Sequence, residues 1–87
     1  MPIVYLRAPL RDLAGGNRQI AVDGATVGEV LRCLERDWPK TTGWILDERG
    51  RIRRHVNVFL NSETVREDTT VGPHDRLHVL PSISGGG

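Results

Sequence analysis

Apolar residues recur along this chain with two different periods, which predict one helix and several strands. From Val27 to Leu34 they fall at i, i+3, i+4 and i+7, with Trp38 one turn further on, and this spacing predicts an amphipathic helix. Between residues 56 and 60 they alternate instead, which predicts a strand with one face toward a core. Alternation or short apolar runs predict further strands at 3–7, 18–22, 63–66 and 77–80.

The start and end of the predicted helix are marked by specific residues. Thr26 and Glu29 have the spacing of a capping box, in which the Thr26 hydroxyl accepts from the Glu29 amide and the Glu29 carboxylate returns to the Thr26 amide. Pro39 disfavours helical geometry at the residue before it, so the helix ends near Trp38. Gly28 weakens the first turn, which indicates that a strand passes close to it.

The order strand, strand, helix, strands predicts an α+β domain with one helix packed on one face of a sheet. A hairpin turning at 15–17 joins the first two strands, and residues 44–46 cap one end of the core. Pro81 cannot donate to a ladder, so the last strand stops there. We therefore expect a domain over residues 1–81 and a flexible tail over residues 82–87.

Length and composition exclude several classes of function. A chain of 87 residues forms one small domain with little room for a deep active site. Its 12 basic and 11 acidic residues leave a net charge of +1, which argues against a nucleic-acid footprint. The sequence holds no apolar run of membrane-spanning length and no signal peptide, and one cysteine excludes an internal disulfide, so we expect a cytoplasmic protein.

No group of residues within the domain has the spacing of a catalytic or metal site. His55, His74 and His78 are not spaced as metal ligands with Cys33, and we expect surface or boundary histidines. Cys33 lies about 120° from the centre of the apolar stripe of the helix, which predicts an inert thiol at the edge of the core.

Two surface features could bind a partner. Phe59 lies on the strand face opposite Val58, and it is exposed if no second layer covers that face. Arg53 and Arg54 belong to a basic cluster over residues 49–54. This cluster is either a solvated turn or a surface that steers an acidic partner.

The chain ends in Ser84-Gly85-Gly86-Gly87. Glycine contributes no side chain to a core and loses the most backbone freedom on ordering. Such an end suits a thin tail that enters a narrow site and presents its carboxylate there. The alternatives are a frayed terminus or an expression scar.

Three stretches together resemble one known family. They are residues 9–16 ahead of the capped helix, residues 54–66, and residues 75–86, in which a strand ending in Leu80-Pro81 is followed by Gly85-Gly86. The combination resembles the ThiS/MoaD sulfur carriers of the ubiquitin-like β-grasp fold, and most of all their CysO-type branch. The resemblance implies a mixed sheet of four to five strands on one main helix.

The resemblance also implies a carrier that is not itself an enzyme. An activating enzyme of the ubiquitin-activating, MoeB or ThiF type would use ATP to adenylate Gly87, and a thiocarboxylate formed there would pass sulfur to a biosynthetic enzyme. Gly85, Gly86 and Ile83 would bind these partners in the tail, and Phe59, Arg53 and Arg54 would dock the body. No cofactor or metal would be bound, and we expect a monomer when the carrier is alone.

Several alternatives stay open. Gly87 follows the usual glycine pair, so Gly86 carries the sulfur if the end is processed, and a short stretch over residues 68–73 leaves the acceptor enzyme undecided. The acceptor could serve cysteine or another sulfur-containing metabolite, or the chain could be the small subunit of molybdopterin synthase. A ubiquitin-like modifier that forms isopeptide bonds would use the same tail, and a plain interaction module would not need it.

Overall fold

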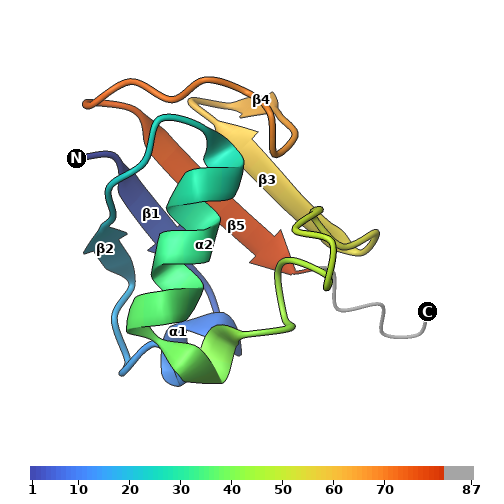
Figure 1. Cartoon of the computed structure of the whole chain (residues 1–87). Coiled ribbons are helices and arrows are strands. Elements are labelled where there is room, and N and C mark those ends of the chain that lie inside the picture. The colour runs from blue at the N-terminus through green and yellow to red at the C-terminus, as the bar shows by residue number, and fades with distance from the viewer. Residues whose placement is uncertain (82–87) are drawn as a thin grey trace.

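The computed structural model describes residues 1–81, and these form a five-stranded sheet with one long helix across one face (Figure 1). The elements, in chain order, are β1 (Ile3–Leu6), α1 (Leu10–Leu13), β2 (Gln19–Ala21), α2 (Val27–Asp37), a 3₁₀ turn (Pro39–Thr41), β3 (Val56–Leu60), β4 (Glu63–Thr64) and β5 (Arg76–Pro81). The predicted α+β architecture is confirmed.

The first and last strands of the domain lie side by side in the middle of the sheet. The strand order is β2-β1-β5-β3-β4, and β1 runs parallel to β5 while every other neighbouring pair is antiparallel. Parallel neighbours need a long connecting segment. The chain between β1 and β5 includes α2, which packs across one face of the sheet. The mixed sheet of five strands on one main helix has the predicted β-grasp arrangement.

The capping box of α2 forms with one difference from the prediction. Thr26 Oγ1 accepts from the Glu29 amide at 3.2 Å, as expected. The Glu29 carboxylate, however, accepts from the Ala25 amide at 3.1 Å rather than from Thr26. Thr26 itself is β-extended (φ −129°, ψ 162°) and forms an isolated bridge with Thr70.

A backbone segment after β4 satisfies the remaining amides at the start of α2. The Val27 amide donates to the Thr69 carbonyl at 2.9 Å, and the Gly28 amide donates to the Glu67 carbonyl at 2.8 Å. A Cβ at position 28 would lie 3.1 Å from the Glu67 carbonyl oxygen, which is closer than ordinary packing allows. The close neighbour expected at Gly28 is therefore present, although it is an irregular segment rather than a strand.

The core lies between α2 and the sheet. Its fully buried members from α2 are Val27, Val30, Leu31 and Leu34, and those from the sheet include Val4, Val58, Leu77 and Val79. Burial of each such aliphatic side chain contributes roughly 1.5–3 kcal/mol to folding. Cys33 is half-buried at the edge of this core, as the helical spacing predicted. Trp38, predicted on the apolar stripe, is also only half-buried and packs against the core.

The cap over one end of the core is smaller than predicted. Ile45 and Leu46 are buried, but Trp44 has 45% of its surface exposed. Gly43, in a left-handed conformation with φ 86°, turns the chain just before these residues. Two consecutive apolar residues are enough to close this end, so the indole beside them is left at the surface.

The connection between β1 and β2 differs from the predicted simple hairpin. The two strands pair antiparallel as expected, but the short helix α1 stands between them. Leu10 on α1 is fully buried and Leu13 packs against the core, so this turn of helix adds apolar side chains to the core beside α2. One helical turn is too short to produce a detectable period in the sequence, which is why the pattern missed it.

We predict that Thr26→Ala lowers the free energy of unfolding by about 1 kcal/mol, because the variant loses the hydrogen bond to the Glu29 amide. Urea unfolding followed by circular dichroism measures the difference. Thr26→Ser keeps the hydroxyl and should unfold nearly as the parent does. Equal losses in the two variants would show that the methyl group, not the cap, stabilises this end.

A hydrogen-bonded network joins the turn after β3 to the loop before β5. Asn61 Nδ2 donates to Asp75 Oδ1 at 2.9 Å, and the Arg76 amide donates to Asn61 Oδ1 at 3.1 Å. The Gly72 amide donates to Asp75 Oδ2 at 2.7 Å. The bond from Asn61 and then that from Gly72 hold the pKa of the Asp75 carboxyl below its ordinary value of 3.8. Asn61 adopts a left-handed φ of 49°, which asparagine tolerates well.

We predict that Asp75→Ala destabilises the protein at neutral pH and much less in acid. The pKa of Asp75 is lower in the folded state, so its stabilisation is complete above its ordinary pKa of 3.8 and is lost as pH falls through the folded value. Urea unfolding at pH 7 and at pH 2.5 should show the gap between parent and variant narrowing. Asp68→Ala, at an exposed position, is the control, and a gap independent of pH would contradict the prediction.

Candidate functional site

One face of the sheet is left uncovered by the described residues, and it is apolar and aromatic where it meets β5. Alternation along the strands turns Val4, Leu6 and Val79 toward α2 and turns the residues between them to the other side. We call this surface the open face. It is formed chiefly by Tyr5, Arg7, Phe59, His78 and Leu80.

An aromatic row crosses the open face from strand to strand. Tyr5 is the register partner of His78, and His78 is in turn the partner of Phe59 on β3. The rings of Tyr5 and His78 stack with centroids 4.6 Å apart and an interplanar angle of 10°. All three side chains are half-buried, so they present ordered apolar surface to solvent. The exposure expected for Phe59 is thus partial, and Phe59 belongs to a larger surface.

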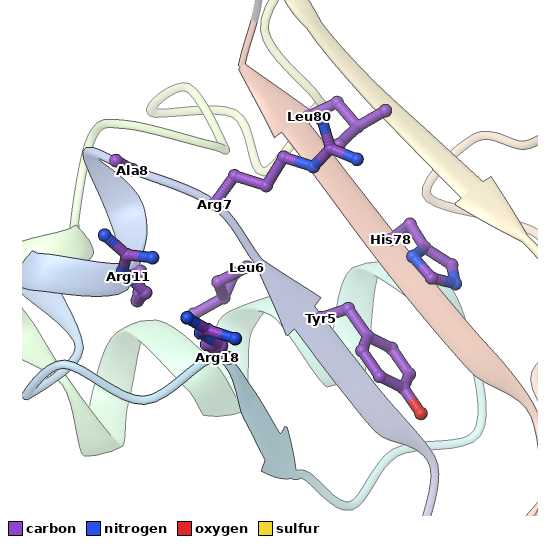
Figure 2. A pocket seen from close by; sticks show the side chains of 8 residues that line it. All are labelled: Tyr5, Leu6, Arg7, Ala8, Arg11, Arg18, His78 and Leu80. Carbon is purple, nitrogen blue, oxygen red and sulfur yellow. The ribbon is translucent and has the colours of Figure 1, made fainter.

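Two hollows flank this row near the carboxyl end of β5. The larger, of about 470 Å³, lies over β1 and is bordered by Tyr5, Leu80 and three arginines (Figure 2). The smaller, of about 300 Å³, lies over β3 beside Phe59 and Ser62. Arg7, His78 and Leu80 border both hollows and separate them.

The open face adjoins the point where the described chain ends. Pro81 is the last residue of β5, and its register partner is Val56 at the start of β3. Because β1 is parallel to β5 and Leu6 pairs with Val79, the end of β1 lies at the same edge of the sheet. The predicted tail residues Ile83, Gly85, Gly86 and Gly87 lie outside the described residues, and they continue the chain from this edge.

The predicted docking arginines lie near the same edge, just before β3. Arg54 is exposed, whereas Arg53 is half-buried, with its amide bonded to the Ile45 carbonyl at 2.8 Å and its Nε buried without a hydrogen-bond partner among residues 1–81. Glu35 of α2 is close enough to Arg53 for a Coulombic attraction. The structure therefore leaves Arg54 available to a partner and gives Arg53 a largely internal position.

Burial and nearby groups act in opposite directions on the Glu35 carboxyl. Desolvation raises the pKa of the Glu35 carboxyl, and the backbone amides of Leu46 and Gly43, followed by the charges of Arg53 and Arg32, oppose that rise. Glu35 Oε2 is buried without a hydrogen-bond partner among the described residues. Glu35 and part of Arg53 thus contribute to the packing beneath the 43–53 loop, and docking by Arg53 stays a prediction.

Sequence reasoning found Phe59 but missed its neighbours Tyr5, Arg7 and His78. A signal for them exists, because Tyr5 and Arg7 alternate with Val4 and Leu6, and His78 alternates with Leu77 and Val79. Alternation places these residues on the outer side of their own strands. It does not show that β1 and β5 are neighbours, so it could not bring the side chains into one surface.

Other candidate chemistry is absent from the described part of the chain. Within residues 1–81 no three His, Cys, Asp or Glu side chains gather as a metal site would require. His55 and His74 are exposed and His78 is half-buried, in line with the expected surface and boundary positions. No helix in the same range is long and apolar enough to cross a membrane.

The sequence of the chain matches a known protein family. The family model described as the ThiS family matches residues 4–86. The sulfur carrier protein CysO of Mycobacterium tuberculosis is 30% identical over 83 residues, covering 88% of this chain and 89% of the relative. The small archaeal modifier protein 3 of Haloferax volcanii is 38% identical over 68 residues, covering 74% of this chain and 73% of the relative.

Solved structures show the same fold. The chain matches one in a crystal structure of the Amycolatopsis orientalis BexX/CysO complex with a TM-score of 0.89 and 28% identity, over 99% of this chain and 100% of the other. The likeness confirms the ubiquitin-like β-grasp fold and the similarity to the CysO-type branch.

Proposed function

We propose that this chain, which belongs to the ThiS family, is a sulfur carrier protein that acts with partner enzymes and does not itself catalyse a reaction. The observation that carries the proposal is the extent of the family match, which runs from residue 4 to residue 86 and so includes Gly85 and Gly86 together with the folded body. The identity with a sulfur carrier of the CysO type over 88% of the chain supports the same role.

The proposed chemistry takes place on the C-terminal carboxylate. A partner enzyme of the ubiquitin-activating, MoeB or ThiF type transfers AMP from ATP to the Gly87 carboxylate and releases pyrophosphate. Sulfide then attacks the acyl carbon and AMP leaves, so that a thiocarboxylate remains. If a persulfide attacks instead, an acyl disulfide forms and a second thiol must reduce it. Glycine leaves the attacked carbonyl uncrowded and lets the tail enter a narrow channel.

The body of the carrier would position this tail. The open face ends at Pro81, so a partner that docks on Phe59, Tyr5 and Leu80 holds the first tail residue at a fixed place on its own surface. Arg54 lies at the same edge, and Ile83 would anchor the tail itself. The partner supplies the catalytic groups, while the carrier supplies the reacting group and its placement.

Particular relatives support a class of acceptor enzyme and a second candidate role. The structure of a CysO chain in complex with BexX supports a sulfur-accepting biosynthetic enzyme as the second partner. The identity with a small archaeal modifier protein favours ubiquitin-like conjugation as the alternative function. The two roles share the adenylated tail and differ in the nucleophile, which is sulfide in one case and a lysine amine in the other.

We predict that incubation of the full chain with a cognate activating enzyme, ATP and sulfide raises its intact mass by the difference between sulfur and oxygen. Mass spectrometry of the whole protein measures the change, and fragmentation assigns it to Gly87 or to Gly86. A chain lacking residues 85–87 should show no gain and the same unfolding curve. Higher-mass conjugates that survive reducing gels, without a sulfur adduct, would favour the modifier.

We predict that Phe59→Ser weakens binding to the activating enzyme about tenfold, the effect expected from truncating one central aromatic side chain of an interface. Titration calorimetry measures the dissociation constant, and circular dichroism checks the fold. Trp44→Ser removes another partly exposed aromatic side chain, outside the open face, and should leave the affinity unchanged. Equal weakening by both variants would contradict docking through the open face.

A further inference from the structure

The larger hollow of the open face is bordered by several cationic side chains. Three arginines from three different segments border it: Arg7 at the end of β1, Arg11 on α1 and Arg18 just before β2. Figure 2 shows the guanidinium of Arg7 reaching toward Leu80 on β5, with Arg11 and Arg18 beyond the opposite side of β1. The sequence pattern gave no sign of this grouping, because the three arginines are spread over the twelve positions from 7 to 18, with the helix α1 and a turn between them.

These cations have few partners of their own. Arg11 Nε lies 3.7 Å from Asp12 Oδ1, in a pair whose side chains are 36% and 69% exposed. An exposed pair of this length contributes little and leaves the guanidinium available. Neither Arg7 nor Arg18, both exposed, forms an ion pair with any residue of the described range 1–81.

The acidic residues of this end of the sheet are few, and several lie at the opposite end. Asp23 and Glu29 border a hollow beside Met1, at the start of β1, and the Asp75 carbonyl accepts from the Ile3 amide at that same end. The whole chain carries a net charge of only +1, so the three arginines form a local positive region rather than part of an overall excess. A local positive region of this kind orients an acidic partner during encounter.

The shape of the hollow favours a protein segment over a small anion. Its lining includes the apolar surfaces of Tyr5 and Leu80, and its volume is about 470 Å³. The three guanidiniums stand on separate elements around that lining, and none of them is buried. In a specific phosphate site, backbone amides and buried cations point toward one position. A segment with carboxylates next to apolar side chains matches both the arginines and the apolar lining.

We propose that this hollow binds an acidic segment of the partner enzyme, with carboxylates of that segment paired to Arg7, Arg11 and Arg18 and an apolar side chain on Tyr5 and Leu80. The inference rests on the proposed function in one respect, that partners dock on the open face. It adds the chemistry of the partner surface, and it assigns the main electrostatic contact to the hollow beside β1 rather than to the 49–54 cluster.

The direct test uses the isolated full-length protein and a hexaglutamate peptide as the probe. In a ¹⁵N NMR titration at low salt, we expect shifts centred on Arg7, Arg11, Arg18 and Leu80 that disappear at high salt. A hexaglutamine peptide should shift none of them. Shifts centred on residues 49–54, or tighter binding of inorganic phosphate than of the peptide at the same three arginines, would overturn the proposal.

A second measurement applies the test to the partner. Arg7→Gln/Arg18→Gln should raise the dissociation constant for the activating enzyme about tenfold at low salt, mainly by slowing association, and flatten its salt dependence. Arg36→Gln removes an exposed arginine on α2, beyond the opposite face of the sheet, and should change it less than twofold. Equal effects of both variants would refute a specific site.

The two proposals can fail separately. Sulfur loading of the parent chain, measured by intact mass at saturating enzyme, reports on the carrier function alone. Normal loading together with an unchanged affinity in the double variant would refute the acidic-segment site and leave the carrier role standing. Absence of loading together with peptide shifts at the three arginines would refute the carrier role and leave the acidic-segment site standing.

Discussion

The parallel pairing of β1 with β5 is the constraint on which the rest of this structure depends. It places the first and last strands of the domain side by side, with Leu6 opposite Val79, so both strands end at the same edge of the sheet. The start of β3 reaches that edge through the pairing of Val56 with Pro81. The aromatic row, the arginines and the chain that leads to the tail therefore meet at one place.

The crossover that permits this pairing is held at its start by backbone contacts. The first amides of α2 donate to carbonyls of the segment after β4, and Gly28 lets that segment approach to a distance that a Cβ would prevent. Each buried amide at a helix start needs a partner, so these bonds fix both the helix and a part of the chain about forty residues away. The apolar stripe of α2 then covers one face of the sheet and leaves the other open.

The two faces of the sheet differ in a way that suits a small carrier: one packs against α2 and the other is open to partners. The buried aliphatic residues of the core pack on the side of the sheet that α2 covers. The outer face keeps half-buried aromatic rings and exposed guanidiniums, which suit recognition by a larger enzyme. The proposed reaction at the end of the glycine tail would require that this face be held at a fixed distance from the partner's catalytic groups.

The sequence by itself determined the elements with strong local signals: the capped stripe of α2, the alternation of β3, and the end of the last strand at Pro81. It also determined which side of its strand Phe59 occupies, because side chains alternate with a period of two. The family resemblance predicted the fold. The helix α1 was not predicted, because a single turn is too short to show a helical period in the sequence. Only the tertiary structure decided that Phe59 adjoins His78 and Tyr5, that Arg53 packs inward beside Glu35, and that Arg7, Arg11 and Arg18 border one hollow. Local periodicity specifies a residue's face within its own element, whereas neighbours across a sheet are set by strand order and register, which depend on the packing of the whole chain.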